Sequence, residues 1–133
     1  MNRIIDIVCK VLLSFLMVIP ILGTLGIFPA PTADMYTSTE SFAFINVLMG
    51  AWYITATMAI VFVLALIALW TKRVALAALL ILPLTVNIVG FHLFLDGGLF
   101  TAGSVMADAL LLLNGYFLYQ QRAVYRTLLA PKK

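Results

Sequence analysis

Strongly apolar segments of this 133-residue chain contain the polar residues Asn46, Asn87, His92 and Asp108. Counted from the outer ends of the expected membrane spans, they lie roughly 6, 12, 5 and 8 Å deep in that order. A carboxylate inside a span costs about 2.5–3.5 kcal/mol on insertion scales, so Asp108 needs a proton, water or a partner. His92 or Asn87 on the neighbouring helix would supply that partner. The four residues therefore predict a proton-linked or quinone-type polar pocket in the outer half of a helix bundle.

The same residues also have a purely structural interpretation. If the last span begins late, near Ser104, Asp108 falls in its first turn and stabilises that helix end. His92 then faces water or hydrogen-bonds the loop at Asp96. Asn87 and Asn114 then hold helices together through hydrogen bonds between them. Both interpretations stay open from the sequence.

Other motifs that carry chemistry are missing from the sequence. Cys9 is the only cysteine, which excludes an intrachain disulfide and a Cys-x-x-Cys redox pair. His92 is the only histidine, which excludes haem ligation by two histidines of one chain. No Walker loop, dinucleotide fingerprint, His-Glu-x-x-His motif or nucleophile elbow is present. We therefore expect no metal site and assign no catalytic residue, while Cys9 fits a small buried hydrophobe or a palmitoylation target.

Composition identifies the class of protein. Hydrophobic residues make up 65% of the chain and charged residues 10%, whereas soluble domains are near half apolar and a quarter charged. A water-soluble globule is thus excluded, and a single integral membrane domain over 1–133 is expected. The basic residues occur in three groups, at positions 3 and 10, 72 and 73, and 122 to 133. We interpret them as membrane anchors near anionic lipid, and we expect no nucleic-acid partner.

The gaps between the basic groups give the topology. A spanning helix needs roughly 20 apolar residues, so each gap holds two spans joined by an outer turn. The expected spans are 11–28, 42–70, 74–95 and 103–119. The positive-inside rule places both termini and the 72–73 turn in the cytoplasm. The expected fold class is therefore all-α, a transmembrane four-helix up-down-up-down bundle.

Several segments resemble a known family. Residues 82–96, which read LPLTVNIVGFHLFLD, look like the third helix of DoxX-like membrane proteins. The segments 26–31 (GIFPAP) and 113–117 (LNGYF), the latter followed by a basic tail, are similar to other parts of that family. The chain departs from the family at 23–25 (GTL), where many members carry a lysine, and it lacks a glutamate often seen on the second helix.

The resemblance implies a four-helix protein of the bacterial inner membrane, with some relatives serving in thiosulfate:quinone oxidoreductase or in redox-stress assemblies. It leaves three functions open. The favoured one is an accessory or anchoring subunit of a larger membrane complex. The second is the membrane subunit of a quinone-linked oxidoreductase, with His92, Asn87 and Asp108 lining the site. The third is a small proton-coupled transporter. The expected partners are the lipid bilayer and either other membrane subunits or further copies of the chain. No cofactor is assigned, and quinone is the one candidate.

Overall fold

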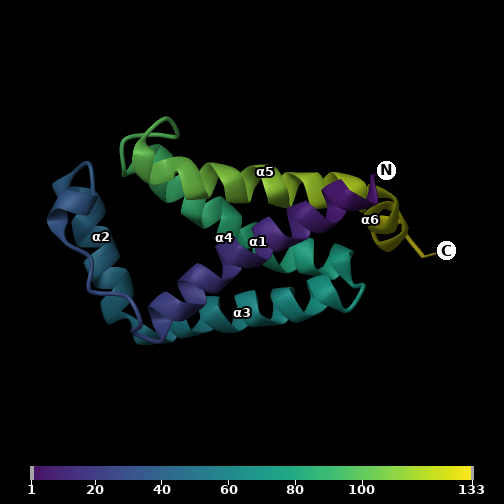
Figure 1. The fold of residues 1–133 in the computed structure, drawn as a ribbon, viewed down its shortest axis with the longest axis horizontal. Helices are drawn as coiled ribbons and strands as arrows, with labels where there is room; N and C mark the ends of the chain where they lie inside the picture. Colours follow the sequence, from purple (N-terminus) through teal and green to yellow (C-terminus); the bar gives the residue numbers. More distant parts are fainter. Residues whose placement is uncertain (1, 133) are drawn as a thin grey trace.

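The computed structural model describes residues 2–132, and in that range the secondary structure is helical, with no strand. Four segments are long and apolar enough to cross a membrane (Figure 1): α1 (Arg3–Thr24), α3 (Trp52–Trp70), α4 (Val74–Phe94) and Ala102–Gln120, which contains α5 (Val105–Gln120). The shorter helices are α2 (Thr39–Gly50) and α6 (Arg122–Leu129). Two 3₁₀ turns, η1 (Ala33–Met35) and η2 (Ala102–Ser104), lie in the connecting loops.

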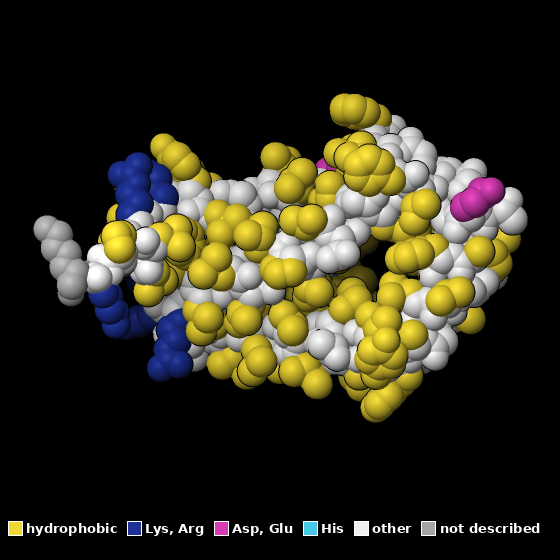
Figure 2. All heavy atoms as spheres, turned by 180° about the vertical axis from the view of Figure 1, so that it is seen from behind, with side chains coloured by type: hydrophobic (Ala, Val, Ile, Leu, Met, Phe, Trp, Pro, Cys, Tyr) yellow, Lys and Arg dark blue, Asp and Glu magenta, His cyan; other side chains and the backbone are white. Residues whose placement is uncertain are grey.

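The long helices pack into one bundle. α4 lies against both α3 and α5, and α1 packs on α3 and α5 from the other side. The buried core contains Leu13, Met17, Phe62, Ala65, Leu69, Ala77, Ala78, Ile81, Leu110 and Phe117. Alanines of α3 and α4 recur in this core, and small side chains let membrane helices approach closely. The outward faces are largely apolar, as Figure 2 shows, which suits contact with lipid.

The expected single helix over 42–70 is divided in the structure. α2 ends at Gly50, and Ala51 (φ −84°, ψ 68°) lies outside the helical region before α3 begins at Trp52. α2 packs mainly on the start of α3 and stands apart from the bundle (Figure 1). Its N-terminal cap, Ser38, donates a hydrogen bond to the carbonyl of Leu95 at the end of α4 (3.0 Å). A straight helix would carry that cap away from α4, so the break is what allows this contact.

The other boundaries differ less from expectation. α1 begins at Arg3, eight residues before the expected 11, because Asn2 caps it by accepting a hydrogen bond from the Ile4 amide (3.0 Å). α1 ends at Thr24, and Gly26 follows with φ +77°, a conformation that suits glycine after a helix. α4 ends one residue before the expected 95. The last span covers 102–120 against an expected 103–119.

Charge is distributed unevenly along the bundle. Lysine and arginine side chains gather at the end that carries α6, whereas acidic side chains are visible at the opposite end, beside α2 (Figure 2). Both chain termini lie at the basic end (Figure 1). Two of these basic residues, Lys72 and Arg73, lie in the short turn between α3 and α4.

Candidate functional site

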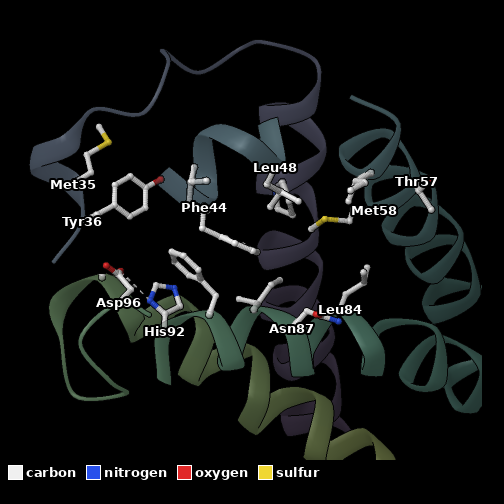
Figure 3. Close-up of a pocket in the computed structure, with 16 residues that line it drawn as sticks. Met35, Tyr36, Phe44, Leu48, Thr57, Met58, Leu84, Asn87, His92 and Asp96 are labelled. Carbon is white, nitrogen blue, oxygen red and sulfur yellow. Dashed lines mark ion pairs between the residues drawn. The ribbon is translucent and has the colours of Figure 1, made fainter. Parts of the chain in front are cut away.

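A cavity of about 730 Å³ opens between α2 and the bundle, at the end opposite the basic residues. Its volume lies in the range of sites that hold small molecules. Most of its lining is apolar, and Figure 3 shows these side chains converging from α2, α3, α4 and the η1 loop. The polar residues of the lining are Tyr36, Thr57, Asn87, His92 and Asp96.

Asp96 forms the polar end of the cavity. It is buried, with a relative exposure of the residue of 2%, although it follows the end of α4. The carboxylate accepts hydrogen bonds from the Thr37 amide (2.8 Å) and the Thr37 hydroxyl (3.0 Å). Burial raises the pKa of Asp96, but the hydrogen bonds of Thr37 and Ser41 and the imidazole of His92 outweigh burial and hold that pKa below its ordinary value. Asp96 thus ties the loop before α2 to the end of α4 as an ionised group.

His92 lies one helical turn before Asp96, and its Nδ1 is 3.4 Å from Asp96 Oδ2. The two side chains are 15% and 3% exposed. Nδ1 is sealed from solvent and makes no aligned hydrogen bond. Nε2 makes no hydrogen bond to another residue among residues 2–132, and His92 lines the cavity, so this nitrogen is available to a ligand there. A carboxylate beside one ring nitrogen orients the imidazole and leaves the other nitrogen for binding.

Aromatic rings form the wall beside His92. Phe44 of α2 stacks on Phe91 of α4, with ring centroids 5.7 Å apart and an interplanar angle of 26°. Tyr36 meets Phe91 edge-on at 6.3 Å, and Phe91 meets His92 edge-on at 5.1 Å. Burial, with a smaller effect of the Asp96 charge, raises the pKa of Tyr36, which keeps its phenol neutral. These contacts hold α2 and η1 over the cavity (Figure 3).

Asn87 lies on the cavity wall about 7.5 Å from His92 along the α4 axis, since the two residues are five positions apart. Its Nδ2 donates to the Pro83 carbonyl (2.8 Å), and the Thr85 hydroxyl donates to the Ile81 carbonyl (2.9 Å). The carbonyl that a proline at position 83 deprives of its donor is that of Leu79. The side chains of Asn87 and Thr85 bond other carbonyls of α4, so neither replaces the hydrogen bond that the Leu79 carbonyl lacks.

The expected cluster of four residues is only partly brought together. His92 and Asn87 line the cavity, whereas Asp108 and Asn46 are not in its lining. α5 begins at Val105, so Asp108 lies in its first turn, where Oδ2 accepts a hydrogen bond from the Ser104 hydroxyl (3.3 Å). The expected pair between Asp108 and His92 is not formed, because Asp96 lies beside His92 instead. Asp108 has the helix-end position of the structural interpretation.

Asn46 and Asn114 have different surroundings. Asn46 is exposed on α2. Asn114 is buried, and its Nδ2 donates to the Ala78 carbonyl across the α4–α5 interface (3.0 Å), as expected for a residue that joins helices. Its Oδ1 is buried without a hydrogen-bond partner in the described part of the chain. Asn114 therefore serves packing and lies outside the cavity lining.

Sequence reasoning missed most of the residues that complete the site. It indicates Asp96 only as part of an outer turn or as a neighbour of His92, and it gives Tyr36, Phe44 and Phe91 no role. One signal was available: His92 and Asp96 are four residues apart at a helix end, a spacing that brings side chains into contact. Nothing in the sequence pairs Thr37 with Asp96, which lies 59 positions away.

No family model, curated protein or solved structure matches the chain. Within residues 2–132, no group of three or more His, Cys, Asp or Glu side chains is placed to hold a metal ion. The site therefore has to be interpreted from its own geometry. It is an apolar cavity with an aromatic wall and a polar end, and it fits a ligand that has an apolar body and a small hydrogen-bonding head.

Proposed function

We propose that the chain is a four-span subunit of a larger complex in the bacterial inner membrane and that its cavity binds a quinone-type ligand. In this proposal the bundle runs up-down-up-down, with both termini and the turn at Lys72 and Arg73 in the cytoplasm. The gathering of basic side chains at one end supports that orientation, because cytoplasmic segments carry an excess of lysine and arginine. The cavity then opens in the outer half of the membrane.

The observation that carries the ligand proposal is His92, which lines the polar end of an apolar cavity with an Nε2 that makes no hydrogen bond among residues 2–132. A quinone has carbonyl oxygens on a ring and an apolar tail. Nε2 donates a hydrogen bond to such a carbonyl, or accepts one from the hydroxyl of the reduced form, depending on its protonation. The Asp96 carboxylate lies 3.4 Å from Nδ1, and Asn87 offers a second polar group in the cavity lining. The apolar lining accommodates the ring and the tail.

A larger complex is proposed because the chain lacks residues for electron transfer of its own. A single cysteine and a single histidine provide neither a dithiol pair nor two haem ligands within one chain. Electrons would therefore pass between the ligand and a partner subunit. The resemblance to DoxX-like proteins agrees with this arrangement. A purely anchoring subunit has no need of a cavity with an oriented histidine, so the quinone-linked function is favoured here.

The test is ligand binding to the purified chain in mild detergent. A short-chain benzoquinone is titrated, and quenching of tryptophan fluorescence reports binding. His92→Leu should weaken binding about tenfold, the equivalent of one lost hydrogen bond of about 1.4 kcal/mol. Asn46→Leu is the matched control, because it removes a polar side chain that is exposed outside the cavity lining. Equal affinity of the wild type and His92→Leu would refute the assignment of the head-group site.

A further inference from the structure

α6 differs from the other helices in the way its residues are arranged. Placed at about 100° per residue, Val124, Tyr125, Leu128 and Leu129 fall on one arc of the helix, and Arg122, Ala123, Arg126 and Thr127 fall on the other. α6 follows α5 directly and turns away from its axis (Figure 1). It is thus a short amphipathic helix placed where a membrane-spanning segment ends.

A hydrogen bond fixes which side of α6 faces the bundle. The Tyr125 hydroxyl donates to the carbonyl of Ala75 in the first turn of α4 (2.9 Å). The apolar arc therefore faces the membrane side, yet the bundle does not cover it. Val124, Leu128 and Leu129 are 44%, 69% and 82% exposed. Apart from Tyr125, the apolar side chains on this side of α6 stay exposed among residues 2–132.

The opposite side of α6 is basic. Arg122 and Arg126 lie one turn apart on it, and Lys132 follows the helix. No acidic residue occurs after Asp108 in the sequence. Arg3, Lys72 and Arg73 add to the same end of the molecule, where Figure 2 shows the basic side chains together. The charge of this end is complementary to anionic lipid head groups.

We propose that α6 is an interfacial helix that binds the anionic phospholipid of the adjacent leaflet. Its apolar arc lies at the boundary between head groups and acyl chains, and its arginines contact lipid phosphates. The proposal concerns the basic end of the molecule and does not depend on the cavity or on its ligand.

The experiment uses the full chain reconstituted into vesicles. Cys9→Ser removes the native thiol, and Leu128→Cys carries an environment-sensitive fluorophore. Its depth is measured by quenching with spin-labelled lipid, in phosphatidylcholine vesicles and in a mixture of phosphatidylcholine and phosphatidylglycerol. We expect the label to enter the bilayer in the anionic mixture. A label on Thr127→Cys, on the polar arc, should remain in water in both kinds of vesicle.

The charge is tested at Arg126, whose guanidinium makes no hydrogen bond or ion pair with another side chain among residues 2–132. Arg126→Gln should lower the ratio of immersed to exposed label about fivefold in the anionic vesicles, and Arg126→Lys should restore it. Arg3→Gln is the control, since it removes a charge from the same end but outside α6. High salt should reduce the difference between the wild type and Arg126→Gln in the anionic vesicles only.

Three results would overturn the proposal. The first is a Leu128→Cys label that stays in water in anionic vesicles. The second is immersion that is equal in both kinds of vesicle and unaffected by Arg126→Gln. The third is self-quenching between labels on different copies at low protein density, because it would show that a second copy of the chain covers this arc.

Discussion

Replacing Asp96 tests the contacts that close the cavity. The carboxylate accepts two hydrogen bonds from Thr37 and lies 3.4 Å from His92 Nδ1. Hydrogen bonds to a charged group contribute about 1.5–3 kcal/mol each, and two bonds from one residue do not add fully. Asp96→Ala should therefore lower the free energy of unfolding by about 2–4 kcal/mol. Asp96→Asn keeps one acceptor oxygen without the charge and should cost about half as much.

The measurement is equilibrium unfolding by sodium dodecyl sulfate in mixed micelles, followed by circular dichroism. Thr37→Val separates the two bonds, because it removes the hydroxyl donor and keeps the amide, and it should cost about 1–1.5 kcal/mol. Glu40→Gln is the matched control. Glu40 is an exposed carboxylate in the first turn of α2, and its replacement should cost only the helix-end contribution of about 1 kcal/mol or less.

The pH dependence provides a second criterion. The folded structure lowers the pKa of Asp96, so the folded state favours the ionised carboxylate. The stabilisation is then complete above the ordinary carboxyl pKa of about 3.9 and is lost as the pH falls through the lower folded value. The difference between the wild type and Asp96→Asn should be constant from neutral pH to about pH 5 and should shrink below about pH 4.

Two results would refute this reasoning. An Asp96→Ala protein within about 0.5 kcal/mol of the wild type at neutral pH would show that the carboxylate does not hold the loop. A difference between the wild type and Asp96→Asn that is the same at neutral pH and below the folded pKa would show that ionisation contributes nothing. If Asp96→Ala does not fold, its free energy of unfolding cannot be measured. Asp96→Asn and Thr37→Val then provide the test.

The remaining predictions concern the last span and the topology. Asp108→Asn should cost about 1 kcal/mol or less in the same unfolding assay and leave quinone affinity unchanged, because Asp108 stabilises the start of α5. A larger loss of stability would show that Asp108 is a buried group with a partner. In a Cys9→Ser background, Phe100→Cys should react with an impermeant thiol reagent from outside intact cells, and Ala130→Cys should react only after permeabilisation. Labelling of Ala130→Cys in intact cells would contradict the proposed orientation.

The long helices could be predicted from the sequence because one physical constraint dominates them. A chain in hydrocarbon must satisfy its backbone within helices, so apolar runs between basic groups predict where helices lie. The segments around Val74–Phe94 and Ala102–Gln120 follow this rule to within one residue. The late start of α5 could also be predicted, since serine and aspartate, the residue types at positions 104 and 108, are common at helix starts.

The site was harder to predict from the sequence than the helices, because its contacts join segments that are distant in the chain. Hydropathy gives the depth of a residue but not the direction in which its side chain points. Asp108 and His92 share a depth, yet Asp108 faces Ser104 in its own helix start. The sequence places Asp96 only in a loop near His92, and its burial depends on the path of the other loop, which brings Thr37 over it. That path in turn depends on the break between α2 and α3.

Local sequence gives only a weak signal of this break: no proline or charge occurs between Phe42 and Trp70, and Gly50, the last residue of α2, is the one helix-weakening residue there. A proline at position 52 tests it. Trp52 is the first residue of α3, a position that tolerates proline, and Ala51 before it lies outside the α region, as a residue before proline prefers. The Trp52 side chain is 72% exposed, so its loss removes little packing.

Trp52→Pro should therefore change the free energy of unfolding by about 1 kcal/mol or less, whereas a proline inside a continuous helix costs about 3 kcal/mol or more. Ile60→Pro is the matched control, because Ile60 is also exposed but lies within α3, and it should show the full cost. If both variants lose about 3 kcal/mol or more, residues 42–70 form one helix. In that case α2 could not lie over the cavity, and the contacts of Phe44 with Phe91 could not form.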